Sequence, residues 1–546
     1  MSNMGTADQM EVLRYISEHS SENTKPDGIA AINSLKLQYC FGLSFDTSSS
    51  NEVEEFVVSC LTLYRSLEKP TKADGVIESQ PRDDLCVMAS MALIKLHQQN
   101  LADKASQTPQ PILIQAAVIL EHVLVGSPHN YEALLLLSRI YLLLGAGSLA
   151  LQTFAKLNVK QMQYESVAHN LFTRLATIHP QPAAQPEGSE ARHFDLQLGL
   201  RVALDFYKRS GVATTRAALQ GLDCGSYVNT QGCIKLQEKL AKSLCRRMWA
   251  LEERRVQRLL GGSPNTRYNH IVFDAAEVTD QRSFEGFMNL EAPGQPTFEE
   301  YVRVGPLIGA NGLKALSLVD TVFYLLTGPK VNPENKSPQP DVEGFSGFEK
   351  DIPKDELTPA EVEGIQIYSA LLKGAKGLSN GQNGAADVQS AIRTASEWVK
   401  RKITQLTEES YIGKNGVHLS DATVVPSWVY LHNSISCVET LLAINILAKR
   451  ASNSKSANVD KEELAALSAD LTQALDTIRT NTKTLKSQVI KPGVLGELIL
   501  ACSAGGDTLQ SKIGEFIDEA ALESFAGSLI ESWEEALDGV STVAMF

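Results

Sequence analysis

The amino-acid sequence predicts an all-α protein with a helical solenoid in its first half and a helical bundle at its C-terminal end. Three observations predict this class. Apolar residues repeat at a spacing of 34 residues between Ala116 and Leu157, and helical periodicity continues through the last third of the chain. The composition is 43 % hydrophobic but only 6 % aromatic, and it is rich in Ala and Leu, which favours helices over sheets.

The repeat has the register of a tetratricopeptide repeat. A small residue lets two antiparallel helices approach closely, and a bulkier residue one turn later fills the gap between them. One such unit cannot bury its own apolar face, so neighbouring helices must stack on it. The sequence therefore predicts a tetratricopeptide-like α-solenoid, defined by Ala116, Leu120 and Val123, which return as Ala150, Phe154 and Leu157.

The chain divides into four predicted parts. Residues 1–262 form the tetratricopeptide-like helical solenoid, and residues 263–327 an extended wrapping segment with a helix. Residues 328–385 are rich in Pro and Gly and are expected to be a linker with a short helix at 359–373. Residues 386–546 carry long helical patterns with short connections, which predict a C-terminal helical bundle packed on the end of the solenoid.

Individual helices of the solenoid follow from the spacing of apolar residues and from the polar, Pro-rich breaks between them. In the N-terminal part we expect helices at 7–19, 26–40, 52–67 and 84–99. After the repeat, further helices are expected at 161–178, 189–209, 213–221 and 226–260.

Composition excludes several classes of protein. The net charge of −14 argues against a general polyanion binder, although a local basic patch can exist in an acidic protein. The eight cysteines include no C-x-x-C pair, so we expect buried thiols in a reducing compartment and neither a disulfide framework nor a metal site. The N-terminus lacks the features of a secretory signal, and no membrane span is expected, so the predicted location is cytoplasmic.

The helix expected at 226–260 carries a line of basic residues. Lys235, Lys239, Lys242 and Arg246 share one face, because they are spaced by four, three and four residues. This face is either a solvated flank or a contact site for an anion, ribosomal RNA or an acidic partner. No aromatic residues alternate with these charges, so sequence-specific nucleic-acid binding is not expected. Further arginines extend the charge and an apolar line is expected to face the core: Arg247, Arg254, Arg255 and Arg258, and Ile234, Leu240, Leu244, Trp249 and Leu251.

Three short runs of sequence resemble the non-catalytic, tetratricopeptide-like subunit of the NatB N-terminal acetyltransferase complex. These runs are L-L-S-R-I-Y-L-L-L-G-A at 136–146, L-N-V-K-Q-M-Q at 157–163 and L-F-T-R at 171–174. Asp280-Gln-Arg282 is similar to a D-N-R segment of that family, with Gln281 where Asn is usual. The resemblance covers residues 1–305 and matches the later part of the family's chain, so the family's N-terminal repeats are expected to be absent from this sequence.

The resemblance implies a scaffold without catalytic activity. It would form a heterodimer with a catalytic subunit of the GNAT fold, wrapping and stabilising it. That partner, and not this chain, would bind acetyl-CoA and acetylate nascent chains that begin with Met-Asp, Met-Glu, Met-Asn or Met-Gln. The scaffold would also help to dock the complex at the ribosome.

The absence of common catalytic motifs predicts a chain that catalyses nothing and binds no cofactor. The sequence contains no P-loop, no G-x-S-x-G and no H-E-x-x-H. The acetyl-CoA pattern [Q/R]-x-x-G-x-[G/A] is approached only at Arg258-Leu-Leu-Gly-Gly-Ser263, which fails at its last position. No catalytic residue is therefore assigned, and Lys235, Lys239, Lys242 and Arg246 remain the candidate interaction residues.

Two other functions stay open at this point. One is a tetratricopeptide adaptor that binds peptide termini through a basic clamp, although residues 131–157 place Leu and Ala where such a clamp needs Lys, Arg and Asn. The other is an enzyme of unknown type, in which residues distant in the sequence would meet in a reactive pocket.

Overall fold

The protein is described by a computed structural model, in which helices account for most of the chain. The described residues are 11, 28–45, 49–67, 79–102, 112–184, 195–262, 267–274, 276–328, 338–420, 422–454, 459–503 and 506–543. Among them, β1 (Val417–His418) and β2 (Val424–Val425) form a short antiparallel ladder, and an isolated bridge joins Ser243 and Thr279. The all-α class is confirmed, and the helix expected at 7–19 lies outside the described residues except for Glu11.

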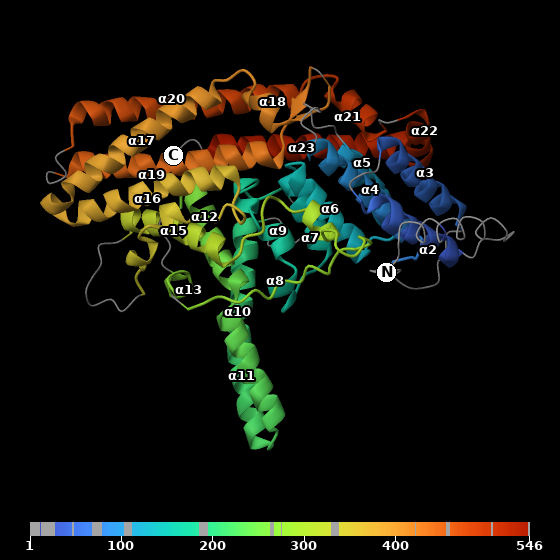
Figure 1. Ribbon diagram of the computed structural model, residues 1–546, viewed down its shortest axis with the longest axis horizontal. Coiled ribbons are helices and arrows are strands. Elements are labelled where there is room, and N and C mark those ends of the chain that lie inside the picture. Colours follow the sequence, from blue (N-terminus) through green and yellow to red (C-terminus); the bar gives the residue numbers. More distant parts are fainter. Residues whose placement is uncertain are drawn as a thin grey trace.

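The N-terminal helices stack side by side, as the repeat predicts (Figure 1). Ala116 and Ala150, the small residues of the repeat, are both completely buried. Asn130 starts one helix because its Oδ1 accepts a hydrogen bond from the backbone N–H of Ala133 at 3.1 Å. The helices are α2 (Gly28–Gln38), α3 (Ser50–Ser66), α4 (Asp83–Ala102), α5 (Ile112–Gly126), α6 (Tyr131–Leu143) and α7 (Gly147–Lys156).

The single helix expected at 161–178 is wrong. The chain instead forms three short turns, because Thr173 is extended and Arg174 has a positive φ of 60°. That backbone conformation directs the Arg174 guanidinium to the carboxylate of Glu361, where two hydrogen bonds measure 3.0 Å each. The turns are α8 (Gln163–Ser166), α9 (His169–Phe172) and the 3₁₀ helix η2 (Leu175–Thr177).

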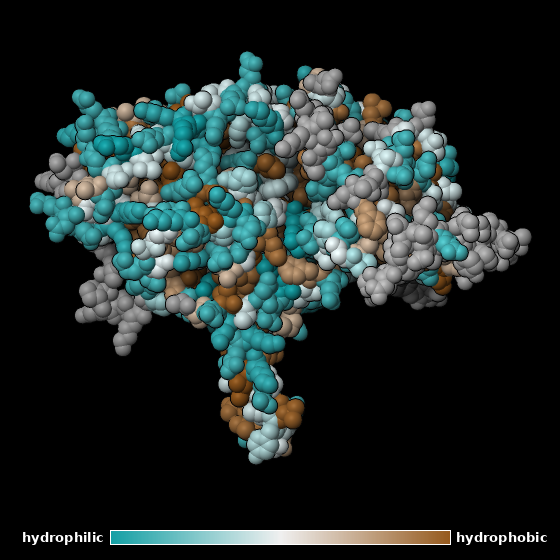
Figure 2. Space-filling view, viewed as in Figure 1, coloured by the Kyte–Doolittle hydropathy of each residue, from teal (hydrophilic) through white to brown (hydrophobic). Residues whose placement is uncertain are grey.

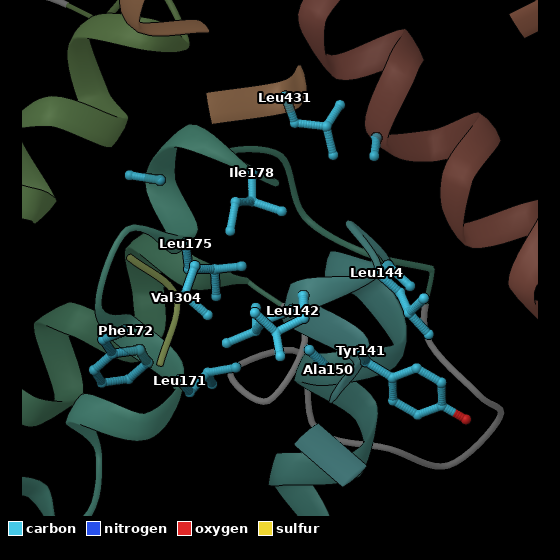
Figure 3. Close-up of a cluster of buried hydrophobic side chains, with 14 of the residues drawn as sticks. Tyr141, Leu142, Leu144, Ala150, Leu171, Phe172, Leu175, Ile178, Val304 and Leu431 are labelled. Carbon is cyan, nitrogen blue, oxygen red and sulfur yellow. The ribbon is translucent and has the colours of Figure 1, made fainter. Parts of the chain in front are cut away.

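These turns join the solenoid to the C-terminal helices through one apolar cluster (Figure 3). Leu142 of α6 lies beside Leu175 in this cluster, with Ile178 close by, and Leu144 lies at the edge of the cluster. Leu431 approaches the cluster from the C-terminal half of the chain. The first and last parts of the sequence therefore share a single core at this point.

An extended segment runs from residue 276 to residue 309 and contains only the short helix α14 (Phe298–Tyr301). Glu291 of this segment is buried and forms an ion pair of 2.8 Å with Lys95 of α4. It also accepts a hydrogen bond of 2.9 Å from the hydroxyl of Tyr39, in the π-helical turn η1 (Tyr39–Leu43). The segment is thus fixed to the N-terminal helices by a buried charge.

Long helices form the second half of the chain. α16 begins at a capping box made by Thr358 and Glu361, and it is longer than the helix expected at 359–373. It packs on α15, α17 and α19. The division of the whole chain into four parts stays a prediction. The bounds are α15 (Ala310–Thr327), α16 (Pro359–Ser379), α17 (Ala385–Leu406), α18 (Tyr411–Asn415), α19 (Trp428–Asn453), α20 (Lys461–Val489), α21 (Val494–Cys502), α22 (Asp507–Phe516) and α23 (Glu519–Val543), with 3₁₀ turns η4 (Glu343–Phe345), η5 (Phe348–Lys350) and η6 (Gly381–Gly384).

The last three helices, α21 to α23, lie along the N-terminal helices of the solenoid, which differs from the expected packing on its end (Figure 1). α22 returns to α3, where the ring of Phe516 meets that of Tyr64 at 5.5 Å. α23 returns to the α6–α7 turn, where the indole N–H of Trp533 donates to the carbonyl of Leu144 at 2.6 Å. Helices from the two ends of the chain are therefore direct neighbours.

A buried cluster of ion pairs connects the middle of the chain to these C-terminal helices. It is centred on α12 (Leu244–Leu259), whose Arg255 and Arg258 both bind the carboxylate of Glu439 on α19, at 2.8 and 3.0 Å. Arg258 and Arg254 also bind Asp320 on α15, at 2.8 and 3.0 Å. Since Glu439 and Asp320 are each about 2 % exposed, both carboxylates depend on these arginines for compensation.

Removal of Glu439 is expected to destabilise the protein strongly. The Glu439→Leu variant leaves Arg255 buried without its closest partner, a change that costs about 3–5 kcal/mol in the free energy of unfolding. The matched control is Glu408→Leu, which removes an exposed ion pair with Lys414 and is expected to cost less than about 1 kcal/mol. Urea unfolding followed by circular dichroism measures both. Equal effects of the two substitutions would contradict the role of the buried cluster.

Glu252 makes stability depend on pH. Burial raises the pKa of Glu252 from 4.5 to about 7, and the charge of Arg255 only partly offsets this. Between these two pKa values the Glu252 carboxyl binds more protons in the folded state than in the unfolded state, so its contribution to stability falls as the pH rises. We expect this contribution to fall by up to about 3 kcal/mol from pH 5 to pH 8. Burial lowers the pKa of His97, His179 and His432 to about 4, and these groups act in the opposite sense below pH 6.5, so the Glu252 contribution is the difference between the parent and a variant.

The Glu252→Gln variant carries a neutral side chain in both states, and we expect that it lacks this loss of stability. Urea unfolding at a series of pH values compares the variant with the parent. The control is the exposed carboxylate Glu55, whose change to Gln should leave the parent's slope in place. A variant whose stability changes with pH in the same way as the parent's would contradict the assignment to Glu252.

Candidate interaction site on a protruding helical hairpin

The candidate residues lie at and near a helical hairpin that projects from the body of the protein (Figure 1). Its two arms are α10 (Leu196–Asp223) and α11 (Tyr227–Ala241). α10 has 28 residues and is therefore about 42 Å long. It begins at Asp195, whose Oδ1 accepts a hydrogen bond from the backbone N–H of Leu198 at 3.1 Å.

The expectation of two separate helices at 189–209 and 213–221 is wrong, because the chain continues as one helix through Gly211. The hairpin turns at Gly225, which has a positive φ of 69°. Close to the turn, Gly221 lets the arms approach, since a Cβ at this position would lie 2.6 Å from the hydroxyl of Thr230. That hydroxyl donates to the carbonyl of Ala218 on the opposite arm at 3.2 Å.

The helix expected at 226–260 is also wrong, since α11 ends and α12 begins on either side of Ser243. The Ser243 hydroxyl caps α12 by accepting a hydrogen bond from the N–H of Arg246 at 2.9 Å. Thr279, from the extended segment, inserts here: its N–H donates to the carbonyl of Lys242 at 2.7 Å, and its carbonyl accepts from the N–H of Leu244 at 3.0 Å. The break therefore depends on a residue distant in the sequence.

A buried carboxylate anchors the root of the hairpin. Glu165 accepts a hydrogen bond of 2.6 Å from the hydroxyl of Ser243, and another from the hydroxyl of Tyr207 on α10. Burial raises the pKa of Glu165, while these two hydroxyl donors act against that rise. Burial also raises the pKa of Tyr207, and the neighbouring Glu165 carboxylate adds to the effect. The arm α10 and the junction between α11 and α12 are thus both fixed to the short turn α8.

The structure separates the four candidate residues into two groups. Lys235 and Lys239 are exposed on α11, and Lys242 is exposed at its C-terminal cap. Arg246 lies on α12 instead, where it is half-buried and donates to the carbonyl of Ala241 at 3.2 Å. Burial lowers the pKa of Arg246, and nearby Asp274 acts against this. The three lysines share one helical face, while Arg246 does not belong to it.

The arginines expected to extend the positive surface of this region do not do so as a group. Arg254 and Arg255 are buried, and Arg258 is 14 % exposed, because these side chains enter the ion-pair cluster with Asp320 and Glu439. Conversely, Ile234, a member of the apolar line that the sequence predicts to face the core, is 46 % exposed. The positive charge at this surface therefore comes from the hairpin.

The hairpin differs in charge from the rest of the protein. Between residues 208 and 242 it carries six cationic and two anionic side chains, whereas the whole chain has a net charge of −14. Such a local surplus attracts anionic surfaces over short distances. The cations are Lys208, Arg209, Arg216, Lys235, Lys239 and Lys242, and the anions are Asp223 and Glu238.

Sequence reasoning missed a second feature, the exposed apolar residues of the hairpin. Figure 2 shows a brown patch at its end. Val212 and Leu219 are each 59 % exposed, and Tyr227 and Val228 at the turn are 75 % and 83 % exposed. The spacing of seven residues from Val212 to Leu219 could have indicated an apolar face, but only the structure shows that nothing within the described chain covers it.

The described residues contain no group of three or more His, Cys, Asp or Glu side chains arranged to hold a metal ion. α19 is long and apolar enough by composition to cross a membrane, and 72 % of its apolar window is buried inside the protein. That burial against the neighbouring helices accounts for its composition.

Solved structures resemble this fold over nearly the whole chain. The NatB acetyltransferase complex bound to a bisubstrate inhibitor contains a chain that aligns with a TM-score of 0.52 and 14 % identity, covering 96 % of this chain and 70 % of that one. The NatB complex bound to CoA and MES gives a TM-score of 0.52 and 13 % identity, covering 97 % of this chain and 66 % of that one. These likenesses concern the fold.

Relatives by sequence carry names from one family. N-terminal acetyltransferase B complex subunit arm1 of Schizosaccharomyces pombe is 23 % identical over 289 residues, which cover 53 % of this chain and 33 % of arm1. The human N-alpha-acetyltransferase 25, NatB auxiliary subunit, is 29 % identical over 210 residues, covering 38 % and 20 % of the two chains. Subunit MDM20 of Saccharomyces cerevisiae is 23 % identical over 222 residues, covering 40 % and 25 %.

The chain spans a third or less of the length of these relatives. A family profile described as the N-acetyltransferase B complex (NatB) non catalytic subunit matches residues 1–289. Because this match covers more than half of the sequence, the chain belongs to the family of NatB non-catalytic subunits.

Proposed function

We propose that this chain is the non-catalytic scaffold of a NatB N-alpha-acetyltransferase complex, and that it binds and stabilises a catalytic subunit of the GNAT fold. The observation that carries the proposal is the family match over residues 1–289. The catalytic partner would acetylate the N-terminal Met of chains that begin with Met-Asp, Met-Glu, Met-Asn or Met-Gln. The complex would act in the cytoplasm on nascent chains.

The physical properties of the fold support a scaffold role. Stacked helices give a large surface whose shape is fixed before the partner arrives, which lowers the entropy cost of association. Here the surface is held at several points along its length, by the Glu439 ion pairs, by Glu291 and by the contact of Trp533 with Leu144. The scaffold can therefore bind without first ordering itself.

Co-expression tests the proposal directly. We expect this chain and the GNAT subunit of the same organism to elute together from size-exclusion chromatography with the mass of a 1:1 complex. We also expect Met-Asp and Met-Glu peptides to be acetylated by the complex far faster than by the catalytic subunit alone. A catalytic subunit that is equally stable and active without this chain would contradict the scaffold role.

The alternative, a tetratricopeptide adaptor for peptide termini, is tested with the same preparation. Fluorescent peptides with free C-terminal carboxylates should show no saturable binding to this chain, since residues 131–157 place mainly buried apolar side chains in the repeat. Saturable binding that is lost when the carboxylate is amidated would favour the adaptor over the scaffold.

We further propose that Lys235, Lys239 and Lys242 contact the ribosome or an acidic partner surface. These lysines are exposed on one face of an arm that extends away from the body, where an anionic surface can reach them (Figure 1). Arg246 would stabilise the end of α11 that carries these lysines, since its guanidinium donates a hydrogen bond to the last carbonyl of α11. The contact is electrostatic and independent of base identity.

Reversal of the three lysines to Glu is expected to weaken ribosome association while the helical content stays unchanged. Each phosphate contact contributes about −0.7 to −0.9 to the slope of log K against log salt, so the slope should become shallower by about two to three. Co-sedimentation with ribosomes over a salt series measures this slope.

The matched control reverses three exposed lysines outside the hairpin: Lys354, Lys461 and Lys491. It changes the net charge by the same amount. If the hairpin lysines make a specific contact, the control variant keeps the parent's slope of log K against log salt. Equal weakening by both triple variants would show that only the net charge matters and would remove the assignment to the hairpin.

A further inference from the structure

A groove of about 650 Å³ runs along the root half of the hairpin. One wall is α10, and the other is formed by the end of α11 and the start of α12. Leu240 is buried in the groove with 5 % exposure, while Val212 and Leu219 are each 59 % exposed along its wall. The groove is therefore apolar along its length, and it is open to other molecules.

The groove wall on α10 has the spacing of a helix-packing surface. Its residues recur at intervals of three and four, which places them on one face of the helix over about 17 Å. Gly211 and Thr215 are small, as is Ala241 on the facing wall, so the backbone of a third helix can approach closely between the arms. The stripe consists of Lys208, Gly211, Val212, Thr215, Arg216 and Leu219.

Positive charge lies within this stripe and on the facing wall. Lys208, Arg216 and Arg246 line the groove, and no carboxylate is among its described lining residues. The carboxylate of Asp274 lies near Arg246 and balances part of its charge. A bound element with apolar residues at its centre and acidic residues on its flanks would be complementary to this surface.

We propose that the groove binds an amphipathic α-helix of another protein, with acidic residues on the flanks of its apolar face. The helix would lie between the arms of the hairpin and complete a three-helix bundle. Its apolar residues at positions i, i+3, i+4 and i+7 would contact Val212, Leu219 and Leu240. Its carboxylates would pair with Lys208 and Arg216.

This binding site is distinct from the lysine face discussed above. At about 100° per residue, Lys235, Lys239 and Lys242 lie on the side of α11 opposite to Gln237 and Ala241, which line the groove. The hairpin can therefore present the lysines and the groove to different molecules. The inference depends on neither the catalytic partner nor the ribosome.

The test uses the full chain and a fluorescein-labelled synthetic helix of about 18 residues, long enough to span the groove. One peptide has Leu at the four helix-packing positions with Glu on both flanks, and a second peptide replaces each Glu by Lys. Fluorescence anisotropy measures their binding. We expect saturable binding of the Glu-flanked peptide and none of the Lys-flanked peptide.

Two double variants locate the bound peptide. The groove variant combines Val212→Asp with Leu219→Asp, and it should weaken binding by at least about tenfold. The matched control combines Tyr227→Asp with Val228→Asp, which adds the same charge at exposed positions of the turn outside the groove. The control should bind as the parent does. Circular dichroism verifies that all proteins have the same helical content.

Four results would overturn the proposal. The first is no saturable binding of the Glu-flanked peptide, and the second is equal binding of both peptides. The third is an unchanged affinity of the groove variant or an equal loss in the control variant. The fourth is competition by an RNA duplex whose own binding is lost in the groove variant, which would make the groove a nucleic-acid contact.

Discussion

The buried carboxylate of Glu439 is the constraint on which the central architecture depends. Two arginines of α12 reach it from one side, and it can stay charged in the interior only while they remain there. Burial alone would raise the pKa of Glu439, but Arg255 and Arg258 outweigh this and lower it. Ion pairs of this kind have strict geometry, so they fix how α12 is oriented against α15 and α19.

The orientation of α12 in turn fixes the hairpin. α11 and α12 meet at Ser243, where Thr279 pairs with the backbone and Glu165 holds both Ser243 and Tyr207. A long two-helix arm needs such a rigid base, because a small rotation at its root moves its end by many ångströms. The buried ion-pair cluster of α12 therefore sets the direction in which the hairpin projects, and with it the direction in which the lysines and the groove face (Figure 1).

Much of the fold could be predicted because apolar spacing reports local helices. The repeat around Ala116 and Ala150, the capping box at Thr358 and the lack of motifs for catalysis are all features of short stretches. The predicted helix bounds are wrong where a residue distant in the sequence determines where a helix ends. Arg174 breaks a helix to reach Glu361, and α11 ends where Thr279 inserts. Likewise, the charge of Arg254, Arg255 and Arg258 predicts a positively charged exposed face. The sequence does not show that buried carboxylates lie opposite these arginines.

The return of α22 and α23 to the first helices affects how the chain is made. Phe516 and Trp533 pack against residues synthesised several hundred positions earlier, Tyr64 and Leu144. At about 5–20 residues per second, the early helices wait roughly 20–90 s for these final neighbours. During that interval their apolar sides remain open to water and to chaperones. The late synthesis of α22 and α23 thus sets how long these apolar sides stay uncovered while the chain is made.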